Sequence, residues 1–245
     1  MAKDECITFD NYKCIWNSNR ESYYHGVAFI YKEHLNITLL NNILPHYDHI
    51  DTVLDSKNST IIKQYLPSID IDIKKAHVTE GRILVIQCQF NNNTVIIVGT
   101  YCPNSGVNKE QPLKRLAYRT FAWDKDLYHY LNLLKQEHPV IWLGDLNVVI
   151  KDNDVLNVKA NIAGITIEER TNMKEFMVDW IDTWDIKNDV IKPSLRATWG
   201  VKGRFPLRLD YVICSESLKD HIVSSTIDQN YDGSDHIPIG SQFIL

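Results

Sequence analysis

The chain has 245 residues, of which 44% are hydrophobic and 23% are charged, and its formal net charge is -5. This composition is that of a folded globular protein and excludes a mainly disordered chain. The acidic balance also excludes a protein that coats nucleic acid through its overall charge. Any contact with nucleic acid must therefore use a local basic surface.

Five cysteines at wide spacings, with no Cys-x-x-Cys motif, favour reduced thiols over a disulfide framework. Cys88 and Cys102 lie in or beside apolar runs, so we expect them in the core. No apolar run reaches the length of a membrane-spanning helix, and residues 1–5 lack the apolar core of a signal peptide. We therefore expect a soluble, intracellular protein that does not associate with membranes and is a monomer.

Short β-rich runs recur along the chain and predict strands, because they are too short and too β-branched for buried helices. The triplet Asn91-Asn92-Asn93 predicts a hairpin between two of them. The segment 34–79 is polar, and we predict a long excursion with some local structure there. The predicted strands cover residues 27–31, 83–86, 94–98, 140–143, 209–214 and 237–244.

Helical patterns lie between these strands. Residues 113–137 carry apolar side chains mostly three or four positions apart, including Trp123, which we expect in the core. Thr166 followed by Glu169 predicts a capping box that opens a second helix. The alternation of strands and helices predicts a mixed α/β layered fold, organised as a single domain over residues 1–245.

Polar residues follow several of the predicted strands. Gly144-Asp145-Leu146-Asn147 comes directly after residues 140–143. If the chain stays extended, Asp145 and Asn147 point to the same side, where Asp145 can hold or deprotonate a water and Asn147 can fix it and donate to a phosphate. A strand-end turn, in which Asp and Asn are common, is the alternative interpretation.

Ser234-Asp235-His236 places adjacent side chains on opposite faces, so His236 can contact a phosphate while Asp235 approaches a cation. A buried carboxylate such as Asp210 would hold the imidazole and raise its affinity for a proton. A structural histidine beside a turn aspartate is the alternative. Tyr101 and Asn104 follow a third strand, where an ordinary turn is the alternative. Together these groups suit metal-assisted hydrolysis of a phosphate ester. The remaining histidines, such as His34 and His46, are expected at surface or structural positions.

In this order, the motifs resemble the exonuclease III and apurinic–apyrimidinic (AP) endonuclease branch of the endonuclease–exonuclease–phosphatase superfamily, from about Tyr24 to Leu245. The Gly144–Asn147 and Ser234–His236 motifs are shared across that superfamily, whereas the stretch from Ala163 to Arg170 is more specific to its DNA-repair branch. The further matching motifs are His25-Gly26-Val27-Ala28, Glu80-Gly81-Arg82, Tyr101–Gly106, Arg119 with Trp123-Asp124, and Arg208-Leu209-Asp210-Tyr211.

The resemblance implies a four-layer α/β/β/α sandwich with two mixed β-sheets. It also implies Mg²⁺-dependent cleavage of double-stranded DNA at abasic sites in base excision repair, with Mn²⁺ able to replace Mg²⁺, and an apolar pocket for a flipped-out abasic sugar. The implied catalytic residues are Asp145, Asn147, His236, Asp210, Tyr101 and Asn104; the implied metal ligands are Asp235, Asp145 and Asn147; the implied substrate-binding residues are Trp199, Leu207, Leu209, Asn161, Lys202 and Arg204.

The sequence also departs from the family pattern. An early Gln-Glu motif that supplies a metal ligand does not follow any apolar strand here, so we expect the chain to begin close to or after that point, with Glu5 as the nearest candidate. The loop 200–206 is shorter than usual and the segment 35–79 is longer. Three functions stay open: a nuclease for abasic DNA, a catalytically impaired relative that binds DNA or a protein, and a nuclease for undamaged DNA or RNA.

Overall fold

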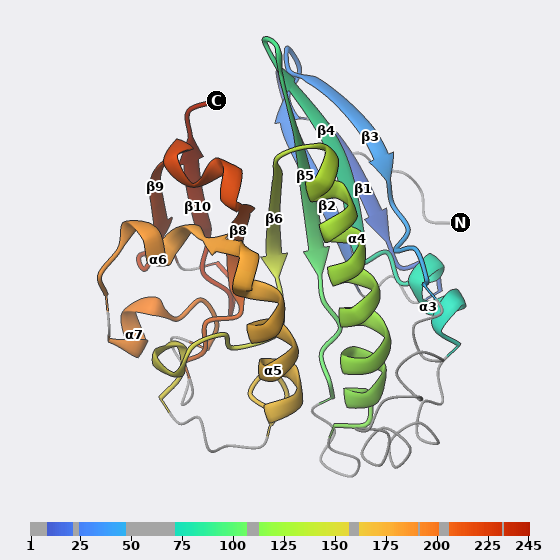
Figure 1. Cartoon of the computed structure of the whole chain (residues 1–245), viewed down its shortest axis with the longest axis vertical. Helices are drawn as coiled ribbons and strands as arrows, with labels where there is room; N and C mark the ends of the chain where they lie inside the picture. Colours follow the sequence, from blue (N-terminus) through green and yellow to red (C-terminus); the bar gives the residue numbers. More distant parts are fainter. Residues whose placement is uncertain are drawn as a thin grey trace.

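The computed structural model describes residues 9–21, 25–47, 72–106, 113–156, 162–190, 192–200, 206–231 and 233–245. Its centre is a six-stranded sheet in the order β3-β4-β5-β6-β8-β7 (Figure 1). β5 and β6 are parallel and the other neighbours are antiparallel, so the sheet is mixed, as the family resemblance implies. Its strands are β3 (Asn36–Asn41), β4 (Ile83–Phe90), β5 (Asn93–Tyr101), β6 (Val140–Asp145), β7 (Trp180–Asp182) and β8 (Asp210–Ser215).

The predicted hairpin between β4 and β5 is confirmed. Phe90 pairs with Asn93, which leaves a loop of two residues, Asn91 and Asn92. Asn91 has a φ of 53°, a left-handed conformation that asparagine tolerates better than most residues. The asparagine run therefore supplies both the polarity and the backbone freedom that this tight connection needs.

The expectation of two mixed sheets is confirmed for only one of them. Within the described residues, the other strands form two separate antiparallel pairs, and no strand lies between the pairs to join them by backbone hydrogen bonds. The first pair packs on the central sheet at Gly99 of β5, where an added Cβ would lie only 2.9 Å from the Phe29 ring. The pairs are β1 (Tyr12–Ser18) with β2 (Gly26–Lys32), and β9 (Ile222–Ile227) with β10 (Ile239–Phe243).

Helices α4 (Asp124–Glu137) and α5 (Ile167–Phe176) cover the face of the central sheet that is opposite β1 and β2 (Figure 1). Aromatic rings fill the space below them: Trp142 of β6 meets Phe176 edge-on at 5.6 Å between ring centroids. The shorter helices are α3 (Ile73–Thr79), α6 (Thr183–Lys187) and α7 (Pro193–Arg196).

The helix predicted over 113–137 differs from expectation at its start. A π-helical stretch, Tyr118–Trp123, precedes α4, and Trp123 is buried as predicted. The predicted excursion at 34–79 contains β3 near one end and α3 at the other, while residues 48–71 lie outside the described part of the chain. Cys88 and Cys102 are buried, as expected. None of the described helices is both long enough and apolar enough to cross a membrane.

Candidate active site

Three strand ends bring the predicted polar residues to one edge of the central sheet. Because β5 and β6 are parallel, both end at this edge, and Tyr101 is the register partner of Asp145. The antiparallel strand β8 begins there, with Asp210 directly opposite Asp145. The strand order therefore collects residues that are more than a hundred positions apart in the sequence.

In the structure, the Asn147 side chain makes hydrogen bonds that differ from those the sequence suggests. Its backbone has a φ of 49°, and its backbone N–H donates to Asp145 Oδ1 at 2.8 Å. Its side-chain Nδ2 donates to Asp145 Oδ2 at 3.1 Å and to the Cys102 carbonyl at 2.9 Å. An amide nitrogen carries two hydrogens, and both are used here. Asn147 therefore holds the Asp145 carboxylate in place and has no hydrogen left to donate to a phosphate.

Asn104 connects the loop after β5 to the loop after β6. Its Nδ2 donates to Asn147 Oδ1 at 3.1 Å, and its Oδ1 accepts from the Gly106 backbone N–H at 2.8 Å. Tyr101, at the end of β5, is half-buried, and the Arg82 guanidinium lies 5.1 Å from the centroid of its ring. The two predicted loops thus form one hydrogen-bonded unit.

The predicted pair of Asp210 and His236 is present, with Asp210 Oδ2 and His236 Nδ1 2.9 Å apart. Buried Thr198 fixes both partners: its Oγ1 accepts from the Asp210 backbone N–H at 3.0 Å, and its carbonyl accepts from the Ile237 N–H at 2.7 Å. Burial alone would lower the pKa of His236. The hydrogen bond with Asp210 and the charges of Asp210 and Asp145 outweigh it and raise that pKa to about 8.

Asp145 and Asp210 place two carboxylates side by side. Burial, and then the charge of Asp210, raise the pKa of Asp145 to about 7. Like charges directly opposite on neighbouring strands repel each other. A cation bound to Asp145 would relieve that repulsion, and carboxylate oxygens are ligands that Mg²⁺ accepts. The donors at this edge therefore fit a divalent cation.

Asp235 is more exposed than this half-buried pair. Its side chain is exposed, and Oδ2 accepts from Trp199 Nε1 at 3.1 Å. That hydrogen bond lowers the pKa of Asp235, so the carboxylate is ionised at neutral pH. Among the described His, Cys, Asp and Glu side chains, no three at this edge have ligand atoms that all lie within 4.8 Å of one another.

The residues expected to bind substrate fall into three groups: some are buried, one is half-buried, and some lie outside the described part of the chain. Leu207 and Leu209 are only 2% and 6% exposed, in a small apolar cluster, so neither presents a surface to a ligand. Trp199 is half-buried against that cluster and pairs with His236 through a backbone bridge. Asn161, Lys202 and Arg204, like the candidate ligand Glu5, lie outside the described residues.

Arg119 supports the candidate site from below the surface, a role that its sequence context did not predict. It is 1% exposed, and its Nη1 and Nη2 donate to the Pro103 and Leu146 carbonyls, both at 2.8 Å. Its Nε donates to Asp124 Oδ1 at 2.6 Å. Arg119 thereby fastens the loops after β5 and β6 to the π-helical stretch. The sequence signal that could have identified this role is the pair of opposite charges, Arg119 and Asp124, within an otherwise apolar helical pattern.

Glu169 links the loop after β5 to the residues that precede α5. The predicted capping box is confirmed, with Thr166 as the N-cap of α5. Glu169 is fully buried, and its Oε2 also accepts from the Gly164 N–H at 2.8 Å, while Ser105 Oγ donates to its Oε1. The capping pattern identified the helix start but could not indicate the link to Ser105, which is 64 residues away.

A mixed α/β fold with an Asp-oriented histidine beside paired, half-buried carboxylates at strand ends is typical of metal-assisted phosphoesterases. The chain belongs to the Endonuclease/Exonuclease/phosphatase family, whose model matches residues 6–236. This confirms the resemblance that the motifs indicated.

Relatives with assigned activities are similar to this chain over two thirds of its length. A DNA-(apurinic or apyrimidinic site) endonuclease of Dictyostelium discoideum is 37% identical over 173 residues, which are 67% of this chain and 46% of that protein. An exodeoxyribonuclease of Bacillus subtilis is 35% identical over 172 residues, 66% of this chain and 64% of that protein. The match thus spans about half to two thirds of these relatives. The crystal structure of the AP endonuclease LMAP from Leishmania major has the same fold, with a TM-score of 0.72 and 22% identity over 96% of this chain and 71% of that one.

Proposed function

We propose that this protein is a metal-dependent DNA phosphodiesterase that cleaves the backbone of double-stranded DNA at abasic sites. The observation that carries the proposal is the Asp210–His236 pair, held beside the half-buried Asp145 carboxylate at one edge of the sheet. This arrangement supplies a cationic donor and a base within one site. The names of the relatives support the choice of DNA and of abasic sites as substrate.

In this proposal His236 stabilises the phosphate. Asp210 holds Nδ1, so Nε2 is the nitrogen that donates to a phosphate oxygen. With a pKa of about 8, the imidazole is mostly protonated at neutral pH and carries a positive charge. A positioned positive donor lowers the energy of the negative charge that develops on the oxygens during the attack.

Asp145 acts as the base. It accepts a proton from the attacking water, whose oxygen forms the new bond to phosphorus as the bond to the leaving oxygen breaks. A pKa of about 7 suits this task, because a general base is most effective when its pKa lies near the working pH. Asn147 is a positioning residue that holds the carboxylate, and Asn104 and Tyr101 bind the phosphate from the neighbouring loop.

The proposed metal is Mg²⁺, with Mn²⁺ able to replace it. Asp235 and Asp145 would hold it, and Asn147 would contribute through its Oδ1, which also accepts from Asn104. When bound, the ion supplies positive charge that polarises the phosphate. Trp199, half-buried next to His236, is the apolar surface that would receive an abasic sugar.

The test is cleavage of a duplex that carries one tetrahydrofuran abasic analogue, compared with the same duplex without it. We expect incision in Mg²⁺, none with chelator, and a loss of at least about a hundredfold for Asp145→Asn. Asp220→Asn, the same chemical change at an exposed position, is the matched control and should behave like the parent. Unimpaired incision by Asp145→Asn would contradict the assigned role.

A second candidate function is binding without cleavage. The exposed position of Asp235, apart from the half-buried carboxylates, favours it, because a dispersed ligand set holds a metal weakly. Retained binding of the abasic duplex with no incision in Mg²⁺ or Mn²⁺ would support this candidate. Equal cleavage of both duplexes would instead indicate a nuclease for undamaged DNA.

A further inference from the structure

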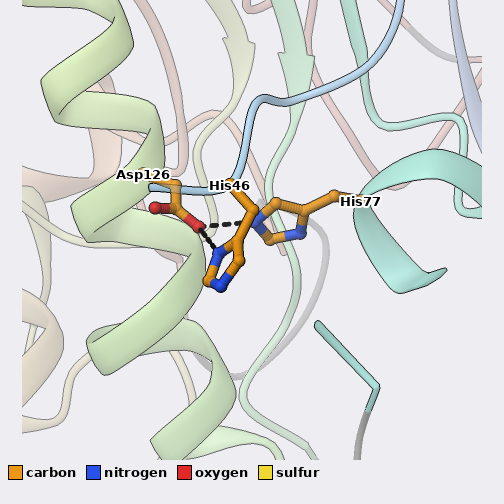
Figure 2. Close-up of side chains that lie close together, drawn as sticks. All are labelled: His46, His77 and Asp126. Carbon is orange, nitrogen blue, oxygen red and sulfur yellow. Dashed lines mark hydrogen bonds and ion pairs between the residues drawn. The ribbon is translucent and has the colours of Figure 1, made fainter. Parts of the chain in front are cut away.

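A cluster of two histidines and one aspartate lies outside the proposed active site. Figure 2 shows the imidazoles of His46 and His77 pointing at the same oxygen of Asp126. His46 Nδ1 is 2.7 Å and His77 Nε2 is 2.9 Å from Asp126 Oδ2, and the three atoms all lie within 4.8 Å of one another. His46 belongs to the segment after β3, His77 to α3 and Asp126 to the first turn of α4.

The His-His-Asp cluster is buried and its members are oriented by further hydrogen bonds. The side chains of His77 and Asp126 are 1% and 2% exposed, and that of His46 is 13% exposed. His77 Nδ1 lies 3.2 Å from the Tyr118 hydroxyl, and Asp126 Oδ1 accepts from the Tyr47 N–H at 3.0 Å. Such outer partners fix the direction of a ligand before a metal binds.

The negative charge of the Asp126 carboxylate favours the binding of a cation at this cluster. The Asp126 side chain is 2% exposed, and its carboxylate oxygens contact the two imidazoles and the Tyr47 N–H. Within the described part of the chain, no lysine or arginine forms an ion pair with it. A buried anion without a full positive partner is costly, and a bound cation would supply that partner.

We propose that His46 Nδ1, His77 Nε2 and Asp126 Oδ2 form a site for a transition-metal ion of the Zn²⁺ type. Two imidazoles and one carboxylate suit Zn²⁺, whereas Mg²⁺ prefers oxygen ligands throughout. Three protein ligands leave the fourth position to water. This site is separate from the Mg²⁺ site proposed at the sheet edge and is independent of it.

The geometry needs little change to accept the ion. Bonds of about 2.0–2.1 Å in a tetrahedron place neighbouring ligand atoms about 3.3 Å apart, so the two contacts would open by about 0.4–0.6 Å. Each imidazole now presents an N–H to the carboxylate. On binding, that hydrogen moves to the other ring nitrogen. For His77 this is Nδ1, which then donates to the Tyr118 hydroxyl.

The ion would clamp three segments together. His46 and His77 are 31 positions apart and flank residues 48–71, and Asp126 lies two residues after Asp124, the partner of Arg119. A metal here would join the segment after β3 and helix α3 to the start of α4. The expected consequence is a metal-dependent gain in thermal stability, because a ligand that binds only the folded state stabilises it.

The experiment is a zinc titration of the full chain, stripped with chelator and returned to millimolar Mg²⁺ so that oxygen-rich sites are occupied. We expect one tightly bound Zn²⁺ per chain and a rise in Tm of at least about 5 °C when zinc exceeds its Kd a hundredfold. Co²⁺ should give the visible absorption of a tetrahedral site. The Asp235→Asn variant should still bind one Zn²⁺, because the His-His-Asp cluster does not include that residue.

The variants His46→Ala and His77→Gln should each weaken zinc binding by at least about a hundredfold and abolish the rise in Tm. His34→Ala removes an exposed imidazole and serves as the matched control, with zinc binding unchanged. His46 is partly exposed, so its variant remains informative if the buried His77 variant does not fold. The proposal is overturned if the parent binds no zinc in Mg²⁺, or if the folded His46→Ala protein binds it as tightly as the parent.

Discussion

Replacing Asp210 with asparagine tests how this site controls the proton on His236. The side chains are nearly the same size, so the fold and the hydrogen bond from the backbone N–H of residue 210 to Thr198 Oγ1 should survive. The change removes the negative charge 2.9 Å from His236 Nδ1, while the partial burial of the imidazole remains. We therefore expect the pKa of His236 to fall.

The size of the effect follows from the structure. The pKa of His236 rises from 6.5 to about 8, which means that its surroundings increase its proton affinity about thirtyfold. Without Asp210, burial opposes a smaller attraction from Asp145, and the pKa should lie near or below 6.5. At pH 7.5 the protonated fraction would fall from about three quarters to about a tenth, whereas at pH 5.5 both proteins would be almost fully protonated.

In the proposed mechanism the protonated imidazole is the form that stabilises the phosphate, so kcat/KM should decline as the pH rises through the pKa of His236. In Asp210→Asn this alkaline decline should begin more than one pH unit lower, and the deficit against the parent should grow from pH 5.5 to pH 8. NMR titration of the His236 ring gives the pKa directly, and the Mg²⁺ concentration for half-maximal rate should be unchanged. A deficit that is constant across pH, or a lost response to Mg²⁺, would refute the reasoning.

Three further predictions concern the same residues and their support. His236→Ala should lower incision by at least about a hundredfold while its circular dichroism matches that of the parent, with His34→Ala as control. Cleavage should rise with Mg²⁺ into the millimolar range, stop with chelator and return in part with Mn²⁺; full activity in chelator would contradict metal dependence. Arg119→Leu should lower the free energy of unfolding in urea by about 3–5 kcal/mol, because Asp124 stays buried without its partner. The exposed control Arg20→Leu should change it little.

The sequence predicted the parts of the fold that local patterns encode. Apolar runs located six of the ten strands in the described residues, the asparagine triplet located the hairpin, and the Thr166–Glu169 pattern located the start of α5. Strands β1, β3, β7 and β9 were missed, because β7 has only three residues and the other three have no continuous apolar run and expose many of their side chains. A short edge or hairpin strand draws its stability from its neighbours, which a local pattern does not contain.

The candidate site likewise has a part that local sequence patterns predict and a part that they do not. The pairing of Asp210 with His236 was predictable because each residue has a recognisable strand-end motif. The use of both Asn147 hydrogens was not, because one of them goes to the Cys102 carbonyl, 45 residues away. The approach of His46 to Asp126 spans 80 residues and has no motif. Contacts of this kind depend on how the loops pack, and only the folded chain brings them together.

The candidate site has two halves, one around Asp145 and one around Asp235, and they are held in place in different ways. Each half should therefore control a different property of the site. The Asp145 half is fixed by buried groups, because Arg119 holds the carbonyls of both loops and Asn147 uses its whole amide on its neighbours. The Asp235 half is exposed and makes its contact through the edge of Trp199. Water activation should therefore depend on the rigid buried half and its pH response. Metal affinity should depend on the exposed half, where the carboxylate can move toward an ion at little energetic cost.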